Sequence, residues 1–193
     1  MKIRFAYAIA AVAMMAATAC QPNKTKSQGT QAEPTQTARQ DTASREDEPK
    51  ISFTMADMNG NNVAVADEFA KHKVTIIDFW ASWCGPCRQE MPSLVKTYDE
   101  YKDKGLGIIG VSLDEDKEQW TGAVSAMGMT WTQLSDLQGW HNSAAQMYGI
   151  QAIPFTIVVD NEGKVLAAGL RGEELTAFIA QQLNAEDNAD RQQ

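Results

Sequence analysis

The segment Val74–Trp80 constrains the fold of this chain more than any other part of the sequence. It is almost continuously apolar and rich in β-branched residues, as a strand that is buried on both faces requires. A second run of this kind follows at Leu106–Leu113, and apolar residues at helical spacing lie between the two, around positions 91–98. Strand, helix and strand in this order favour an α/β fold in which helices cover a sheet.

Further patterns extend the sheet on both sides of this unit. Alternating apolar residues and turn-forming residues predict two hairpins, and apolar residues at helical spacing predict three more helices. The hairpins are expected over 51–65 and 155–170, and the helices near 116–127, 142–148 and 175–183. The sequence therefore predicts one mixed sheet with helices on both faces.

The N-terminus has the pattern of an export signal over residues 1–19. Lys2 and Arg4 precede the apolar run Phe5–Ala19, which is short and rich in alanine. The run ends in small residues directly before Cys20, and this ending resembles the lipobox of bacterial lipoproteins. The resemblance implies that Cys20 becomes a lipidated N-terminus. The alternative is simple cleavage after Ala19, which leaves a free cysteine.

The next segment, residues 20–49, differs sharply in composition from the rest of the chain. After Cys20 it consists mainly of glutamine, threonine, serine, proline and charged residues, with three alanines as its only apolar side chains. Such a segment buries too little apolar surface to offset the entropy lost on ordering. We expect a disordered tether over 20–49, a folded domain over 50–185 and a disordered tail over 186–193.

Charge and composition exclude several classes of function. The chain has 17 lysines and arginines against 25 aspartates and glutamates, which gives a net charge of −8. A chain this acidic without a basic block is a poor candidate for binding nucleic acid or anionic lipid by charge. It also has only two histidines and three cysteines, so we expect no dedicated metal site.

Two cysteines, Cys84 and Cys87, are spaced C-x-x-C between the first buried strand and the following helix. This spacing lets their sulfur atoms meet, and it places Cys84 at the helix N-terminus, where a thiolate is favoured. Pro86 suits the first helical turn, because that turn does not need its N–H group. The alternatives are half of a zinc site, with only His72 and His141 as further ligands, and an inert structural disulfide.

The segment from Asp78 to Cys87 resembles the active-site segment of thioredoxin. The N-terminal hairpin and an insertion over about 114–150, predicted to be helical, resemble the TlpA/ResA-type thiol-disulfide oxidoreductases of the bacterial envelope. The resemblance implies a thioredoxin fold with an N-terminal β-hairpin extension and a central helical insertion. It makes Cys84 the attacking thiolate and Cys87 the resolving thiol. Residues that shape the site would be Trp83, Gly85, Pro86 and Pro92. The substrate-binding cis-proline loop would be Ile153-Pro154, and here Phe155 follows it in place of the usual threonine.

Two acidic residues are candidates for proton transfer. Asp78 lies in the middle of an apolar strand, where burial should raise the pKa of its carboxyl group, and thioredoxin has a buried aspartate at this place. Glu90 matches an active-site glutamate of ResA-like proteins, although a solvated position on the helix surface is the alternative. The three tryptophans of the insertion, Trp120, Trp131 and Trp140, are expected in the core.

These features predict a thiol-disulfide oxidoreductase that reduces disulfides in exported proteins, among which apocytochrome c is one candidate. The redox-active pair would be its only reactive group, so no cofactor is expected. A DsbD-like membrane protein would supply electrons, and the lipid anchor would hold the domain in the cell envelope, facing the periplasm. The alternatives are a peroxiredoxin-like peroxidase, a disulfide isomerase or oxidase on the same fold, and a scaffold without catalytic activity.

Overall fold

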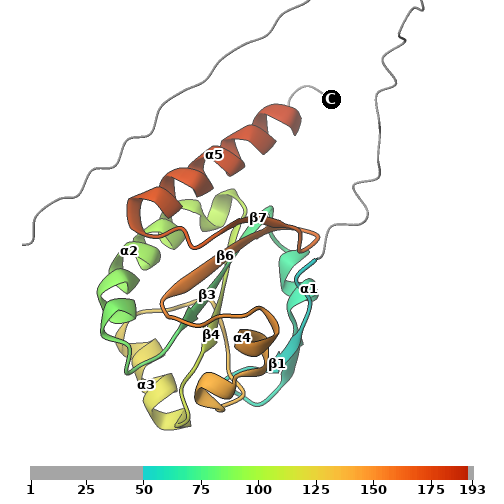
Figure 1. Ribbon diagram of the computed structural model, residues 1–193. Helices are drawn as coiled ribbons and strands as arrows, with labels where there is room; N and C mark the ends of the chain where they lie inside the picture. Colours follow the sequence, from blue (N-terminus) through green and yellow to red (C-terminus); the bar gives the residue numbers. More distant parts are fainter. Residues whose placement is uncertain (1–49, 191–193) are drawn as a thin grey trace, which may run out of the picture. The chain divides into compact units, whose positions relative to one another are not determined.

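The computed structural model of the chain describes residues 50–190 (Figure 1). The elements are β1 (Thr54–Ala56), β2 (Asn62–Ala64), α1 (Val65–Phe69), β3 (Val74–Trp80), α2 (Gly85–Tyr101), η1 (Lys102–Lys104), β4 (Leu106–Ser112), α3 (Lys117–Ala126), β5 (Thr132–Leu134), η2 (Gly139–His141), α4 (Ser143–Met147), β6 (Phe155–Asp160), β7 (Val165–Ala168) and α5 (Gly172–Asp190). The predicted signal peptide, the lipidated Cys20 and the tether over 20–49 lie outside the described residues.

Five strands form the central sheet in the order β5-β4-β3-β6-β7. β3 pairs in parallel with β4, which pairs in parallel with β5, whereas β6 runs antiparallel to both β3 and β7. All seven residues of β3 are buried, as its apolar composition predicted. The mixed central sheet flanked by helices is therefore confirmed.

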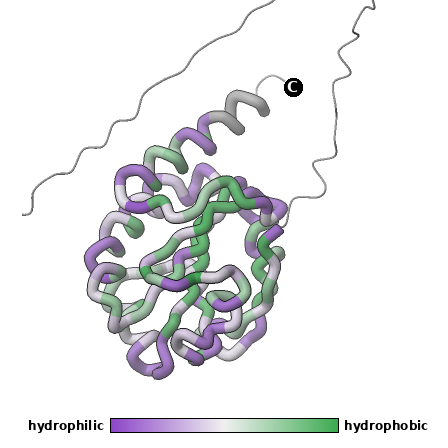
Figure 2. Tube along the Cα trace, viewed as in Figure 1, coloured by the Kyte–Doolittle hydropathy of each residue, from purple (hydrophilic) through white to green (hydrophobic). Residues whose placement is uncertain are grey.

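Helices cover both faces of this sheet, with α2 and α3 on one side of the central strands and α1 and α4 on the other (Figure 1). α2 packs against β4 and α5, and α5 also contacts β3. The central strands form a hydrophobic band through the domain (Figure 2). Their large side chains, among them Ile76, Phe79 and Trp80, are fully buried.

The predicted N-terminal hairpin is present as a separate two-stranded sheet, in which Thr54 pairs with Ala64 and Ala56 with Asn62. Its second strand ends before Val65, which the sequence pattern had placed in the strand and which instead begins α1. Asp67 in the first turn favours a helix electrostatically. Val65 and Phe69 lie one turn apart and are both buried, so packing stabilises this short helix.

Two further elements differ from the sequence prediction. The insertion over 114–150 was predicted to be helical but also contains β5, a strand of three residues at the edge of the sheet. Helix α5 continues to Asp190, past the predicted domain end at 185 and into the predicted tail. No glycine or proline interrupts the sequence there, and alanine and glutamate favour helix continuation.

Within residues 50–190, no helix combines the length and the apolar character that a membrane span requires.

Candidate active site

Cys84 and Cys87 form a disulfide at the N-terminal end of α2, with their Cα atoms 5.3 Å apart. Cys84 is the N-cap residue, and its Sγ accepts a hydrogen bond of 3.2 Å from the backbone N–H of Cys87. This contact satisfies one of the N–H groups that a helix leaves unpaired in its first turn. Pro86 lies in that turn, as predicted from the missing proline N–H group.

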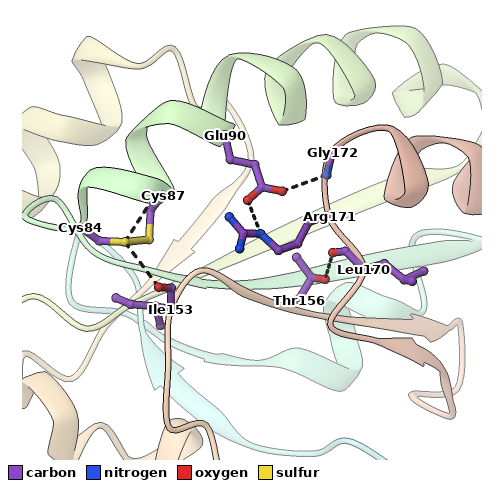
Figure 3. A network of polar contacts seen from close by, with 8 residues as sticks. All are labelled: Cys84, Cys87, Glu90, Ile153, Thr156, Leu170, Arg171 and Gly172. Carbon is purple, nitrogen blue, oxygen red and sulfur yellow. Dashed lines mark hydrogen bonds and ion pairs between the residues drawn. A yellow bond between two sulfur atoms is a disulfide. The ribbon is translucent and has the colours of Figure 1, made fainter. Parts of the chain in front are cut away.

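The two sulfur atoms differ in their surroundings. Cys84 lies beside the loop before β6, where its Sγ is 3.8 Å from the carbonyl oxygen of Ile153 (Figure 3). The peptide bond between Ile153 and Pro154 is cis, as the resemblance implied. Cys87 is 1% exposed and lines a small cavity behind the disulfide. One sulfur therefore lies against the cis-proline loop and the other faces the interior.

Asp78 lies on β3 within the same interior region. In the sheet register it is opposite Gly110 of β4 and Thr156 of β6, and it is 4% exposed. Asp78 lines a cavity of about 10 Å³ together with Cys87, Glu90 and Pro154. This volume is about the smallest that can hold a water molecule.

The electrostatic surroundings of Asp78 favour its neutral form. Burial, reinforced by the Glu90 carboxylate and opposed by the Arg171 guanidinium, raises the pKa of Asp78 to about 7. Such a group exchanges protons near neutral pH, which suits it to acid–base chemistry beside a thiol. The raised pKa that the apolar strand predicted is thus present.

Glu90 does not extend freely into solvent. Its Oε2 atom accepts a hydrogen bond of 2.8 Å from Nε of Arg171, and its Oε1 atom accepts one of 2.9 Å from the backbone N–H of Gly172 (Figure 3). These contacts join the active-site helix α2 to the first residue of α5, whose N-terminus favours a negative charge. The sequence pattern gave no indication of Arg171, because it lies 81 residues from its partner.

A second carboxylate holds the loop directly before the cysteines. Asp114 is 1% exposed and accepts hydrogen bonds from the backbone N–H of Ser82, at 3.0 Å to Oδ2, and from the Ser82 hydroxyl, at 2.5 Å to Oδ1. The Ser112 hydroxyl also donates to Asp114 Oδ2 at 2.7 Å. The segment directly after β4 therefore fixes the position of the chain two residues before Cys84. The sequence pattern gave no indication of this contact.

Trp83 and Trp140 are exposed beside the disulfide. Trp83 is 53% exposed and Trp140 is 42% exposed, and their ring centroids are 6.3 Å apart at an angle of 54°. Trp120 and Trp131 are buried, as expected for core residues. The core prediction for Trp140 is wrong, because the η2 turn presents its ring at the surface next to the active-site loop.

The structure thus gathers most of the residues that were predicted from the sequence. Asp78, Cys87, Glu90 and Pro154 meet at one cavity, and Pro92 lies inside α2. Within the described residues, no three histidine, cysteine, aspartate or glutamate side chains come together as metal ligands. The zinc alternative therefore has no support in this part of the chain.

Comparison with known proteins agrees with this geometry. The Redoxin family matches residues 43–184. The thiol-disulfide oxidoreductase ResA of Bacillus thuringiensis subsp. konkukian is 29% identical over 123 residues, which cover 64% of this chain and 68% of that protein. The thiol:disulfide interchange protein HelX of Rhodobacter capsulatus is 36% identical over 94 residues, which cover 49% of this chain and 50% of HelX.

Solved structures extend the likeness to three dimensions. A thiol-disulfide oxidoreductase from Bacteroides fragilis is 30% identical with a TM-score of 0.64, and the match covers 68% of this chain and 97% of that one. The thioredoxin domain of a thiol-disulfide oxidoreductase from Bacteroides vulgatus is 36% identical with a TM-score of 0.63, with 69% and 94% covered. The chain belongs to the Redoxin family, and within it to the thiol-disulfide oxidoreductases of the TlpA/ResA type.

Proposed function

We propose that this oxidoreductase works as a reductase of disulfides in exported proteins, with Cys84 as the attacking thiolate and Cys87 as the resolving thiol. The observation that carries the proposal is the asymmetry of the pair. Both residues are largely buried, but Cys84 lies at the N-terminus of α2, beside the Ile153–Pro154 loop, whereas Cys87 lines the interior cavity that Asp78 also lines. The N–H groups and dipole of the helix stabilise a thiolate at its N-cap position, which Cys84 occupies.

The reaction takes two exchange steps. In the first, Cys84 Sγ bonds to one substrate sulfur, the substrate disulfide breaks, and the other substrate sulfur leaves and takes up a proton. In the second, Cys87 loses its proton and attacks Cys84 Sγ, and the mixed disulfide breaks to release the second substrate sulfur. Two electrons pass from the dithiol to the substrate, and the chain ends as the Cys84–Cys87 disulfide. In this proposal no bound cofactor takes part.

Asp78 is the proposed base for the second step. A carboxyl group with a pKa of about 7 is partly ionised at neutral pH, so it can accept the Cys87 proton and later return it. Both groups line the same cavity, which supports a transfer over a short path. Glu90 lines that cavity too, and its charge opposes the ionisation of Asp78. We therefore assign Glu90 the role of adjusting this proton transfer.

The remaining site residues would shape the surface that meets the substrate. An extended substrate segment can add a short strand beside the Ile153–Pro154 loop, with its cysteine over Cys84. Trp83 would cover one side of the disulfide. Gly85 and Pro86, the two residues between the cysteines, would set the redox character of the pair, and Pro92 would shape α2 below it.

The reducing direction rests on the Gly-Pro pair between the cysteines. Thioredoxin, with the same pair, has a reduction potential of about −270 mV, against about −120 mV for the oxidant DsbA. A dithiol as reducing as thioredoxin would not stay reduced unaided in an oxidising envelope. We therefore propose lipid anchoring through Cys20, a position in the cell envelope facing the periplasm, and a DsbD-like membrane protein as electron donor. Exported proteins with disulfides, apocytochrome c among them, are the proposed substrates.

Two measurements test the proposal. The protein should reduce insulin disulfides with dithiothreitol as donor, and Cys84→Ser should abolish the turnover. A redox titration against dithiothreitol should give a potential near that of thioredoxin. A potential above about −180 mV, in the range of disulfide isomerases and oxidants, would overturn the reductase assignment.

A further inference from the structure

The strongest feature outside the proposed catalytic groups is a pocket beside the active-site loop. It has a volume of about 360 Å³ and lies between Trp83, the α3 entry and the η2 turn. Its lining consists of Trp83, Leu113, Asp114, Glu115, Asp116, Gln119, Gly139 and Trp140. One lining residue therefore directly precedes Cys84, and most of the others belong to the insertion.

The pocket has aromatic walls that are open to solvent. Trp83 and Trp140 are the two largest exposed apolar side chains in the described part of the chain, and their rings lie 6.3 Å apart. Two exposed indole rings in contact with each other, beside a reactive disulfide, form the kind of apolar surface that marks a binding site. Tryptophan faces also attract cations more strongly than other aromatic rings do.

The charged groups that line the pocket are all acidic. Asp114 is committed to Ser82 and Ser112, and Asp116 accepts the N–H of Gln119 as the N-cap of α3. Glu115 is exposed, and within residues 50–190 it makes no ion pair or hydrogen bond. Lys117 and His141 adjoin pocket residues in the sequence, but neither side chain lines the pocket.

The backbone holds the Glu115 carboxylate next to Trp140. Gly139 has a φ of +56°, and a Cβ atom at this position would collide with Oε1 of Glu115. The missing side chain at position 139 thus leaves room for the carboxylate against the turn that carries Trp140. A carboxylate and two indole faces consequently border the same space.

From this arrangement we infer that the Trp83/Trp140 pocket binds a lysine or arginine side chain of the substrate polypeptide, close to the cysteine that Cys84 attacks. The inference rests on the proposed reductase function and adds a preference among its substrates. A long cationic side chain can contact the indole faces with its stem and Glu115 with its head group. An apolar side chain would take water away from Glu115 without replacing its hydrogen bonds, which is unfavourable.

The position of the pocket limits which substrate residue can reach it. Trp83 directly precedes Cys84, so the pocket begins next to the reacting sulfur. An extended chain advances about 3.4 Å per residue. We therefore expect the cationic residue within about three positions of the substrate cysteine. The part of the substrate segment on the other side of that cysteine would lie along the Ile153–Pro154 loop.

The test uses short peptides with one cysteine in mixed disulfide with 5-thio-2-nitrobenzoate. Attack by Cys84 joins its sulfur to the peptide cysteine and releases the coloured thiolate, so the rate is read by absorbance. Each peptide carries lysine, norleucine or glutamate at one position within three residues of the cysteine. Rates with the reduced protein are divided by rates with dithiothreitol, because a nearby lysine also accelerates simple thiol attack.

At one or more positions, the lysine peptide should react at least about fivefold faster than the norleucine peptide after this correction, an advantage typical of a partly exposed cation over an indole. Glu115→Gln and Trp140→Ala should each reduce the ratio to below about twofold, and Glu115→Lys should shift the preference to glutamate. Glu100→Gln is the matched control, because Glu100 is exposed near the far end of α2, and it should keep the wild-type ratio.

The outcomes separate the inference from the function on which it rests. Equal corrected rates for lysine and norleucine, or a preference for norleucine, would overturn the cationic site while leaving the reductase intact. A lysine preference that survives both Glu115→Gln and Trp140→Ala would place the recognition elsewhere and also overturn it. If no peptide reacts faster with the protein than with Cys84→Ser, the proposed reductase function itself fails.

Discussion

Replacing the buried acid by its amide, Asp78→Asn, should stabilise the protein at high pH and leave its stability unchanged at low pH. Burial, reinforced by Glu90 and opposed by Arg171, raises the pKa of Asp78 to about 7 from a reference value of 3.8. In the unfolded chain the carboxyl group therefore loses its proton at a pH about three units lower than in the folded protein. Each unit of this pKa difference changes the free energy of unfolding by about 1.4 kcal/mol.

The sign follows from the protons bound in each state. Between about pH 4 and pH 7 the unfolded chain has released a proton that the folded protein still holds, so the free energy of unfolding falls as the pH rises. Above pH 7 the loss is complete and amounts to about 4 kcal/mol. Asparagine carries no such charge, so the variant should gain almost nothing at pH 4 and up to about 4 kcal/mol at pH 8.

Urea unfolding of the oxidised protein and of the variant, at half-unit steps from pH 4 to pH 8.5, measures this difference. Asp103→Asn is the matched control, because Asp103 is exposed, and its effect should stay within about 0.5 kcal/mol at every pH. A difference between wild type and Asp78→Asn that does not change with pH would refute the reasoning. It would mean that Asp78 ionises in the folded protein much as it does in the unfolded chain.

Three further outcomes are expected. Asp78→Asn should slow resolution of the mixed disulfide by about 10²-fold without slowing the initial attack, as followed by stopped-flow fluorescence. Resolution rates equal to those of the wild type from pH 6 to pH 9 would remove Asp78 from the mechanism. Arg171→Met removes a cation that lowers the pKa of Asp78, so the pH midpoint of mixed-disulfide resolution should move upward. Arg171→Lys keeps the positive charge and should restore the wild-type midpoint. An unmoved midpoint in Arg171→Met would contradict the role of the Glu90–Arg171 pair. Asp114→Ala leaves the buried Ser112 hydroxyl and the half-buried Ser82 N–H without their acceptor, so it should lower the free energy of unfolding in urea by at least about 3 kcal/mol. A loss below about 1 kcal/mol would show that the loop does not depend on this carboxylate.

The part of the site that could be predicted from sequence is the part with local signals. The apolar pattern of Val74–Trp80 located the central strand and, within it, the buried Asp78. The C-x-x-C spacing located Cys84 at the helix N-terminus, and Ile153–Pro154 followed from the resemblance to thioredoxin. In each case a short stretch of sequence determines the local conformation without help from distant residues.

The features that escaped prediction depend on distant partners or on very short elements. Glu90 and Arg171 are 81 residues apart, and no periodic pattern connects them. The strand β5 has three residues, too few for an alternating pattern to be recognised. Trp140 looked like a core residue because large aromatic side chains are usually buried, and only the turn at Gly139 shows why its ring faces outward beside Trp83.

The central claim is that Cys84 attacks and Cys87 resolves, and capture of the intermediate tests it most directly. Reduced Cys87→Ser, mixed with excess insulin, should accumulate one covalent adduct that peptide mass mapping places on Cys84. Reduced Cys84→Ser should form no adduct at Cys87 on the same timescale, because Cys87 is 1% exposed, against 5% for Cys84, and lines the interior cavity instead of lying beside the cis-proline loop. An adduct on Cys87 that forms as fast as the adduct on Cys84 would contradict the account.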